Sequence, residues 1–200
     1  MKIKTIPVTW LQTNCYIITD PESGKSAVID PGVYNDRLKQ AVEDTGTDSI
    51  EYILLTHCHY DHVLGTDDLK SATGAKVVIH EADVAGLDNP KVRMLTGRVP
   101  TPDIFVRDGD EIKLGGLSFR VMHTPGHTIG AVCFITQDTI FSGDTLFLGT
   151  HGRTDLPTGD HPTIMDSLRK LAGLPGDYDV YPGHGPSTKL NREREWIAIQ

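Results

Sequence analysis

The stretch Leu54-Leu55-Thr56-His57-Cys58-His59-Tyr60-Asp61-His62 places four potential metal ligands within six residues, directly after an apolar run. Residues 50–55, Ile-Glu-Tyr-Ile-Leu-Leu, are rich in β-formers and predict a buried strand. If the chain is still extended as it leaves that strand, side chains alternate between faces, so His57 and His59 point the same way. Imidazoles and a carboxylate at this spacing indicate a site for a borderline cation such as zinc or ferrous iron.

The cluster at 57–62 does not complete a coordination sphere by itself. Two histidines two residues apart can hold one ion from one side, and an adjacent Asp-His pair can hold a second ion nearby. The rest of the chain must therefore supply more ligands. Three Gly-flanked turns after apolar runs offer them: His127 in residues 123–128, Asp144 in residues 141–145 and His184 in residues 181–185.

The order of these motifs resembles the metallo-β-lactamase fold, and within it the hydrolases similar to glyoxalase II (hydroxyacylglutathione hydrolase). The resemblance covers almost the whole chain and rests on the HxHxDH stretch, the later histidine, the Gly-Asp pair and the final Gly-His pair. It implies an α/β (α+β) fold, a four-layer αββα sandwich of two mixed sheets with helices outside. It also implies two divalent metal ions per chain, of which zinc is expected first, while iron and manganese fit the same ligands. The implied ligands are His57, His59 and His127 for the first ion, Asp61, His62 and His184 for the second, and Asp144 as a bridge between them.

Composition sets the outer limits of the prediction. The chain is 38% hydrophobic and 23% charged, which is ordinary for a soluble protein. No apolar run approaches the roughly 20 residues of a membrane span, and the start lacks the apolar core of a signal peptide. Three cysteines without CxxC spacing leave at least one unpaired, which favours a reducing cytoplasm. The net charge of −8 argues against nucleic acid as a partner.

The ligand segments span residues 57–184 and must converge on one site, so we expect a single domain over residues 1–200. The C-terminal helical domain that completes the glutathione site in glyoxalase II is expected to be missing, because the chain ends soon after His184.

Local patterns predict the elements around the ligand segments. Strands at 3–8, 14–19 and 26–30 form a meander, and helix 35–45, strand 50–55, a helix near 63–72, strand 76–80 and a short helix at 81–87 follow. Residues 88–103 hold three prolines and no clean period, so we expect a loop. Its Lys91, Arg93 and Arg98 either attract an anionic substrate or form solvated surface charge, and the second interpretation is favoured. A second meander, helix 162–172, strand 180–181 and helix 190–199 complete the chain.

The ligand types favour hydrolysis. Nitrogen and oxygen ligands leave positions open for solvent, unlike the closed Cys-rich sites of structural zinc. Two ions about 3.5–4 Å apart can hold a bridging water and lower its pKa, so that hydroxide attacks a carbonyl at pH 7. A thiolate is a good leaving group, so a small-molecule thioester suits this site, and the resemblance to glyoxalase II implies S-lactoylglutathione as the expected substrate. Asp61 is expected to orient the hydroxide, and Asp144 to hold both ions.

The resemblance implies that Gly152 and Arg153 hold the glutathione moiety, as a Gly-basic pair does in this region of glyoxalase II. The family's tyrosines shortly after the basic residue and after the last metal histidine are absent here. If Arg153 binds an anionic group, Arg153→Ala should raise KM by roughly ten- to a hundred-fold. If Arg153 pairs with Asp155 or Asp160 instead, KM should stay within about two-fold.

Alternatives remain open at this stage. Gly152-Arg153-Thr154-Asp155 also resembles the persulfide dioxygenases, which use one iron, held here by His57, His127 and Asp144. A binding protein that has lost activity is less favoured, because every ligand position is filled. The fold also allows other hydrolases, such as a lactonase or a nuclease, but nothing in the sequence marks either activity.

Two further histidines and one turn near the motifs have supporting interpretations. His80 and His123 each end a predicted strand and are interpreted as structural or as outer neighbours of the site. The turn Asp30-Pro31-Gly32 is interpreted either as an outer neighbour of the metal site or as a turn alone, in equal measure.

Overall fold

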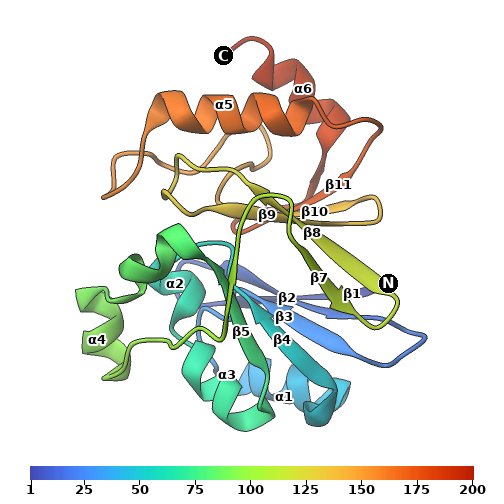
Figure 1. The fold of residues 1–200 in the computed structure, drawn as a ribbon, viewed down its shortest axis with the longest axis vertical. Helices are drawn as coiled ribbons and strands as arrows, with labels where there is room; N and C mark the ends of the chain where they lie inside the picture. The colour runs from blue at the N-terminus through green and yellow to red at the C-terminus, as the bar shows by residue number, and fades with distance from the viewer.

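The computed structural model describes residues 1–200 as two six-stranded sheets packed face to face, with helices on the outer side of each (Figure 1). In the first sheet the spatial order follows the chain: β1 (Lys2–Val8), β2 (Thr13–Thr19), β3 (Ser26–Ile29), β4 (Ile50–Leu54), β5 (Lys76–His80) and β6 (Ile104–Val106). In the second sheet the order is β12 (Thr188–Lys189), β11 (Asp179–Pro182), β10 (Thr139–Gly143), β9 (Val132–Thr136), β8 (Leu117–His123) and β7 (Glu111–Leu114).

The helices form the two outer layers. Figure 1 shows α5 (His161–Ala172) and α6 (Leu190–Ile197) over the second sheet. The opposite layer contains α1 (Asp36–Thr45), α2 (Tyr60–Val63), α3 (Thr66–Thr73) and α4 (Pro90–Thr96), with the 3-10 turns η1 (Thr47–Ser49) and η2 (Glu81–Leu87). No helix of the chain combines the length and the apolar character needed to cross a membrane.

Three separate apolar clusters explain the four layers, because each pair of neighbouring layers must bury one interface. In β2, Ile17 joins the cluster shared with α1, and its neighbour Ile18 joins the cluster between the sheets. In β9, Phe134 lies between the sheets, whereas Ile135 packs with α5. Both strands are buried on both faces, so alternation sends successive side chains into different clusters. The predicted αββα sandwich of two mixed sheets is confirmed.

Parallel strand pairs decide where the functional residues meet. The pairs β3–β4 and β10–β11 are parallel, so the two strands of each pair end at the same edge of their sheet. Asp30 follows β3, and Asp144 follows β10. Backbone hydrogen bonds also join the two sheets at this edge, from Asn14 N to Gly183 O (2.7 Å) and from Val132 N to Thr56 O (2.9 Å). One edge of the sandwich therefore collects the chain segments that follow several strands.

The structure corrects the predicted loop at 88–103, because α4 occupies residues 90–96 within it. Proline is tolerated in the first turn of a helix, where its missing N–H has no intrahelical partner. Pro90 stands at that position, and the Asn89 side chain accepts a hydrogen bond from Lys91 N. Gly97, with φ of 68°, ends the helix in the left-handed region.

The predicted helix near 63–72 is also corrected, to two short helices separated by Leu64 and Gly65. A side chain at Gly65 would collide with the backbone of the turn at residues 30–32, since an added Cβ would lie 2.5 Å from Pro31 O. The short strand β12 was not predicted.

Candidate metal centre

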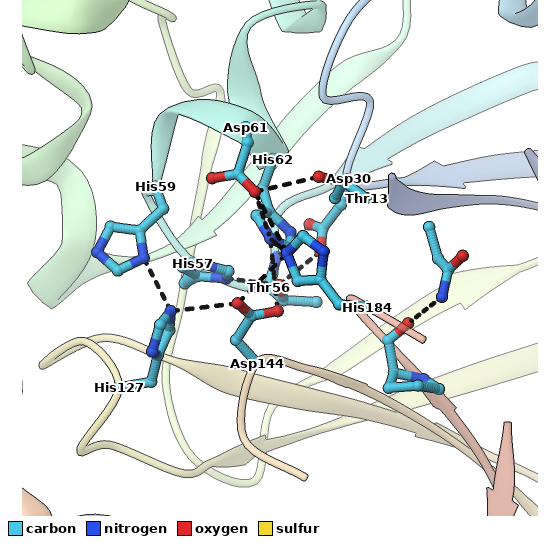
Figure 2. Close-up of polar contacts among 12 residues, drawn as sticks. Thr13, Asp30, Thr56, His57, His59, Asp61, His62, His127, Asp144 and His184 are labelled. Carbon is cyan, nitrogen blue, oxygen red and sulfur yellow. Dashed lines mark hydrogen bonds and ion pairs between the residues drawn. The ribbon is translucent and has the colours of Figure 1, made fainter. Parts of the chain in front are cut away.

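The residues of the HxHxDH motif leave β4 and turn into α2, and the structure brings all seven predicted ligands to one place (Figure 2). The His57 and His59 rings lie on the same side of the chain, with centroids 4.9 Å apart. His127 comes from the loop between β8 and β9, Asp144 from the end of β10 and His184 from the end of β11. Asp61 and His184, which lie 123 positions apart in the chain, are thus neighbours.

His57, His59 and His127 form the first ligand group, with one ring nitrogen of each within 4.8 Å of the others. His59 Nδ1 and His127 Nε2 lie 2.8 Å apart. His57 Nε2 is buried and has no hydrogen-bond partner. Buried polar atoms are almost always paired, so these converging lone pairs call for a cation.

Asp61, His62 and His184 form the second ligand group. His62 Nε2 lies 3.3 Å from His184 Nε2, which in turn lies 3.3 Å from Asp61 Oδ2. Asp144 stands between the two groups, since Oδ2 is 3.4 Å from His127 Nε2 and Oδ1 is 3.4 Å from His62 Nε2. Asp144 Oδ1 is buried and accepts no hydrogen bond.

This donor set fits divalent cations. It consists of imidazole nitrogens and carboxylate oxygens, which suit zinc, iron and manganese. The two unpartnered buried atoms, His57 Nε2 and Asp144 Oδ1, are the atoms that a cation would satisfy. The seven side chains form two groups that share Asp144, which is more than one ion needs.

Asp30 orients two of the histidines, His62 directly and His57 through Thr56. Its Oδ2 accepts hydrogen bonds from His62 Nδ1 (2.9 Å) and Thr56 Oγ1 (2.6 Å), and its Oδ1 accepts one from Thr56 N (2.8 Å). Because the Thr56 hydroxyl donates to Asp30, it accepts from His57 Nδ1 at 3.0 Å. Both rings therefore carry a proton on Nδ1 and turn Nε2 towards the centre. The interpretation of Asp30 as an outer neighbour of the site agrees with this geometry.

Asp83 is a buried supporting residue that sequence reasoning missed. Its carboxylate accepts hydrogen bonds from Cys58 N (2.9 Å), Thr128 Oγ1 (2.7 Å) and Gly130 N (2.6 Å). It thereby ties the segment that carries His57 and His59 to the loop that carries His127. No sequence signal distinguishes this aspartate from others in the chain, because it belongs to an unremarkable turn after β5.

The two ligand groups differ in their affinity for protons. Burial and the neighbouring rings hold the pKa of His57 well below its usual range, and burial lowers the pKa of His59 to about 4 and of His127 to about 3. These imidazoles present free lone pairs at neutral pH. Burial also opposes the charged form of His62, but the carboxylates of Asp144, Asp30 and Asp61 outweigh it and raise the pKa to about 10. The carboxylate-rich second group therefore attracts positive charge strongly.

Gly152 and Arg153 lie next to this centre, and the structure places the backbone of both against His127. An added Cβ at Gly152 would lie 2.1 Å from Asp144 O and 2.8 Å from His127 Nδ1, so only glycine fits there. The Arg153 carbonyl accepts a hydrogen bond from His127 Nδ1 (2.7 Å). The Arg153 guanidinium donates two hydrogen bonds to Asp155, of 2.7 and 2.6 Å, and its side chain is 62% exposed.

His80 and His123 lie outside both ligand groups, as expected. Their rings stack with centroids 4.2 Å apart.

Cys58 packs against Gly86, on the helix side of the first sheet and outside both ligand groups. Burial raises the pKa of its thiol, so it remains protonated. We expect Cys58→Ala to keep the metal content and most of the activity, and to lower the free energy of unfolding by roughly 1 kcal/mol for the lost packing. Metal analysis and thermal denaturation measure both effects. Loss of metal in this variant would contradict the extended geometry of residues 56–59.

A cavity of about 650 Å³ opens onto the centre. His59, Asp61, His127, Asp144 and His184 line its inner end, and apolar walls are supplied by Leu11, Ile129, Phe147, Leu156 and Pro157. A cavity of this size accommodates a ligand of several hundred daltons.

Comparison with known proteins agrees with this geometry. The family model of the metallo-beta-lactamase superfamily matches residues 8–184. The hydroxyacylglutathione hydrolase GloC of Haemophilus influenzae is 37% identical, over 97% of this chain and 95% of its own length.

Two solved structures have a similar fold. The B3 metallo-beta-lactamase BLEG-1 superposes with a TM-score of 0.87 and 32% identity, over 97% of both chains. TTHA1623, solved in a di-iron-bound form, has a TM-score of 0.84 and 33% identity, over 98% of this chain and all of its own. The motifs, the sandwich and the clustered ligands agree with the family match: this chain belongs to the metallo-beta-lactamase superfamily and is a metal-dependent hydrolase of that fold.

Proposed function

We propose that the protein hydrolyses thioesters, of which S-lactoylglutathione is the leading candidate, with two divalent cations at the centre. The observation that carries this proposal is the position of Asp144 between two complete ligand groups at the inner end of the cavity. The similarity to a hydroxyacylglutathione hydrolase supports a thioester substrate.

The seven ligand residues would hold the cations in two groups. His57, His59 and His127 would hold one cation, Asp61, His62 and His184 the other, and Asp144 both. Such a pair of cations, when bound, makes hydroxide available at neutral pH and polarises the carbonyl of the substrate. Asp61 is held in place by a hydrogen bond from Thr13 Oγ1 (3.1 Å) and can accept a hydrogen bond that orients the attacking hydroxide. The apolar walls exclude water from the reacting carbonyl, and the thiol leaves through the open end.

A direct assay tests the activity. The purified, metal-loaded protein should hydrolyse S-lactoylglutathione, measured as loss of thioester absorbance and release of free thiol. A β-lactam serves as the comparison substrate, because one similar structure is described as a B3 metallo-beta-lactamase. Oxygen consumption with glutathione persulfide, without thioester hydrolysis, would instead favour the mononuclear iron enzyme.

Metal stoichiometry is the second test. Protein purified without chelator should contain close to two ions per chain, because Asp144 separates two complete ligand groups. His184→Ala should keep one ion and lose the other, since His184 belongs to the second group alone. Elemental analysis of both proteins measures this. A single tightly bound ion in the wild type, unchanged by His184→Ala, would refute the dinuclear proposal.

The Arg153 side chain is expected to contribute little to substrate binding. Its guanidinium already makes a two-point contact with Asp155 at an exposed position, and exposed pairs of this kind contribute little to stability. We expect Arg153→Ala to leave KM for S-lactoylglutathione within about two-fold and kcat unchanged. Steady-state kinetics with confirmed metal content measures this, and a ten-fold rise in KM would show that the guanidinium leaves Asp155 to bind substrate.

A further inference from the structure

Lys91 and Arg153 are the two basic residues in the wall of the cavity. Their environments differ. Arg153 is neutralised by Asp155, whereas Lys91 has no carboxylate within 4.0 Å of its ammonium group. The other two basic residues of the segment 88–103 are also paired, Arg93 with Asp88 and Arg98 with Asp68. Lys91 is thus the one uncompensated cation that faces the cavity.

The position of Lys91 is well defined. Asn89 Oδ1 accepts a hydrogen bond from Lys91 N at 2.8 Å, and this contact fixes the first turn of α4. The Lys91 ammonium lies 4.3 Å from the centre of the Tyr60 ring, and that ring stacks on Trp10 with centroids 5.9 Å apart. A cation over an aromatic face is attracted electrostatically by the ring, so its position does not depend on a neighbouring carboxylate.

Tyr60 connects this cation to the reaction centre. It stands between His59 and Asp61, one member of each ligand group, and all three residues line the cavity. Asp144, Tyr60 and Lys91 line the same cavity, so one ligand bound in it can meet both the metal centre and Lys91. The net charge of the chain is −8, so an unpaired cation at this place is a specific attraction for anions in an otherwise acidic protein.

We propose that Lys91 binds a carboxylate on the thiol half of the substrate and so determines specificity for anionic thioesters. This inference rests on the proposed function and deepens it. The thiol half is the relevant one because a hydroxyacyl group such as lactoyl is uncharged, whereas a glutathione-like thiol carries two carboxylates. Lys91 makes this contact in the ground state and the transition state alike, so its loss raises KM and leaves kcat nearly unchanged.

The test measures binding and does not depend on turnover. S-hexylglutathione, a thioether that cannot be hydrolysed, is titrated calorimetrically into metal-loaded protein, and its dimethyl ester lacks the two negative charges. Lys91→Met removes the charge and keeps most of the stem against Tyr60. It should weaken binding of the acid about ten-fold and binding of the ester less than two-fold. The loss should shrink at high salt, because the site is open to solvent.

Arg93→Met is the matched control. It removes the same charge from the same helix, but Arg93 is paired with Asp88 and does not line the cavity. Both ligands should bind this variant as they bind the wild type. An equal loss for acid and ester in Lys91→Met, an unchanged affinity for the acid, or no preference of the wild type for the acid would each overturn the inference.

The measurements distinguish failure of the proposed hydrolase function from failure of the Lys91 anion site. Charge-selective binding through Lys91 without hydrolysis of any thioester would refute the proposed function and leave the anion site intact. Hydrolysis of S-lactoylglutathione with the same KM in Lys91→Met and wild type would refute the anion site alone.

Discussion

Replacement of Asp144 by alanine should lower kcat/KM for S-lactoylglutathione by at least about a thousand-fold, which corresponds to roughly 4 kcal/mol of transition-state stabilisation. Asp144 approaches both ligand groups, with its two oxygens each 3.4 Å from a histidine nitrogen on opposite sides. Without Asp144, the two groups share no carboxylate that could hold two cations close together. Metal catalysis contributes several kcal/mol through that arrangement. Kinetics and elemental analysis on the same preparation measure the loss of activity and of metal.

Asp155→Ala is the matched control for Asp144→Ala. It also removes one carboxylate, but Asp155 is exposed and contacts Arg153 at the outer wall of the cavity. We expect it to keep both ions and nearly full activity. If Asp144→Ala retained two ions and activity within ten-fold of the wild type, Asp144 would not be the bridge between the groups.

Asp30→Ala should be the most destabilising single change outside the ligands themselves, at about 3–5 kcal/mol. Three buried donors lose their acceptor: His62 Nδ1, Thr56 N and Thr56 Oγ1. Each buried donor left unsatisfied costs about 1–3 kcal/mol. Asp30 also has a φ of 50°, a conformation that aspartate tolerates better than alanine. For a chain of this length we expect Tm to fall by roughly 6–20 °C.

The same substitution should weaken metal binding by about ten- to a hundred-fold, because His62 loses its acceptor and Thr56, which contacts His57, loses the acceptor that orients its hydroxyl. Thermal denaturation and competition with a chelator measure the two effects separately. Asp30→Asn keeps the shape and the tolerance for positive φ, so it should recover part of the stability and less of the metal affinity. An unchanged Tm in Asp30→Ala would mean that water replaces the carboxylate and that this network is not rigid.

Local spacing was sufficient for the parts of the site that follow from the geometry of a single segment. His57 and His59 share one side because alternation is a property of an extended chain itself. The apolar spacing of Leu38, Ala41 and Val42 predicted α1 in the same way, and these residues are its buried face. The loop predicted at 88–103 was wrong because its prolines were counted without regard to their position. Pro90 stands in the first turn of α4, where proline is tolerated.

Contacts between distant segments could be anticipated only through the family resemblance. Spacing gave no reason to pair His62 with His184, which lie 122 positions apart, and the resemblance supplied that grouping. Neither source predicted the contacts of Asp83. The pairing of Arg153 with Asp155 was one of two alternatives that the sequence left open, and the structure shows this pair.

The sequence alone was enough to predict a mixed α and β chain with a metal-ligand motif after a buried strand, because periodicity and ligand chemistry are local properties. The three-dimensional structure was needed to identify the carboxylates that support the histidines, the arginines that are already neutralised and the lysine that faces the cavity. Hydrogen bonds and ion pairs require atoms within about 3–4 Å. For segments that are far apart in the chain, the packing of the two sheets sets those distances, and the order of residues along the chain does not specify them.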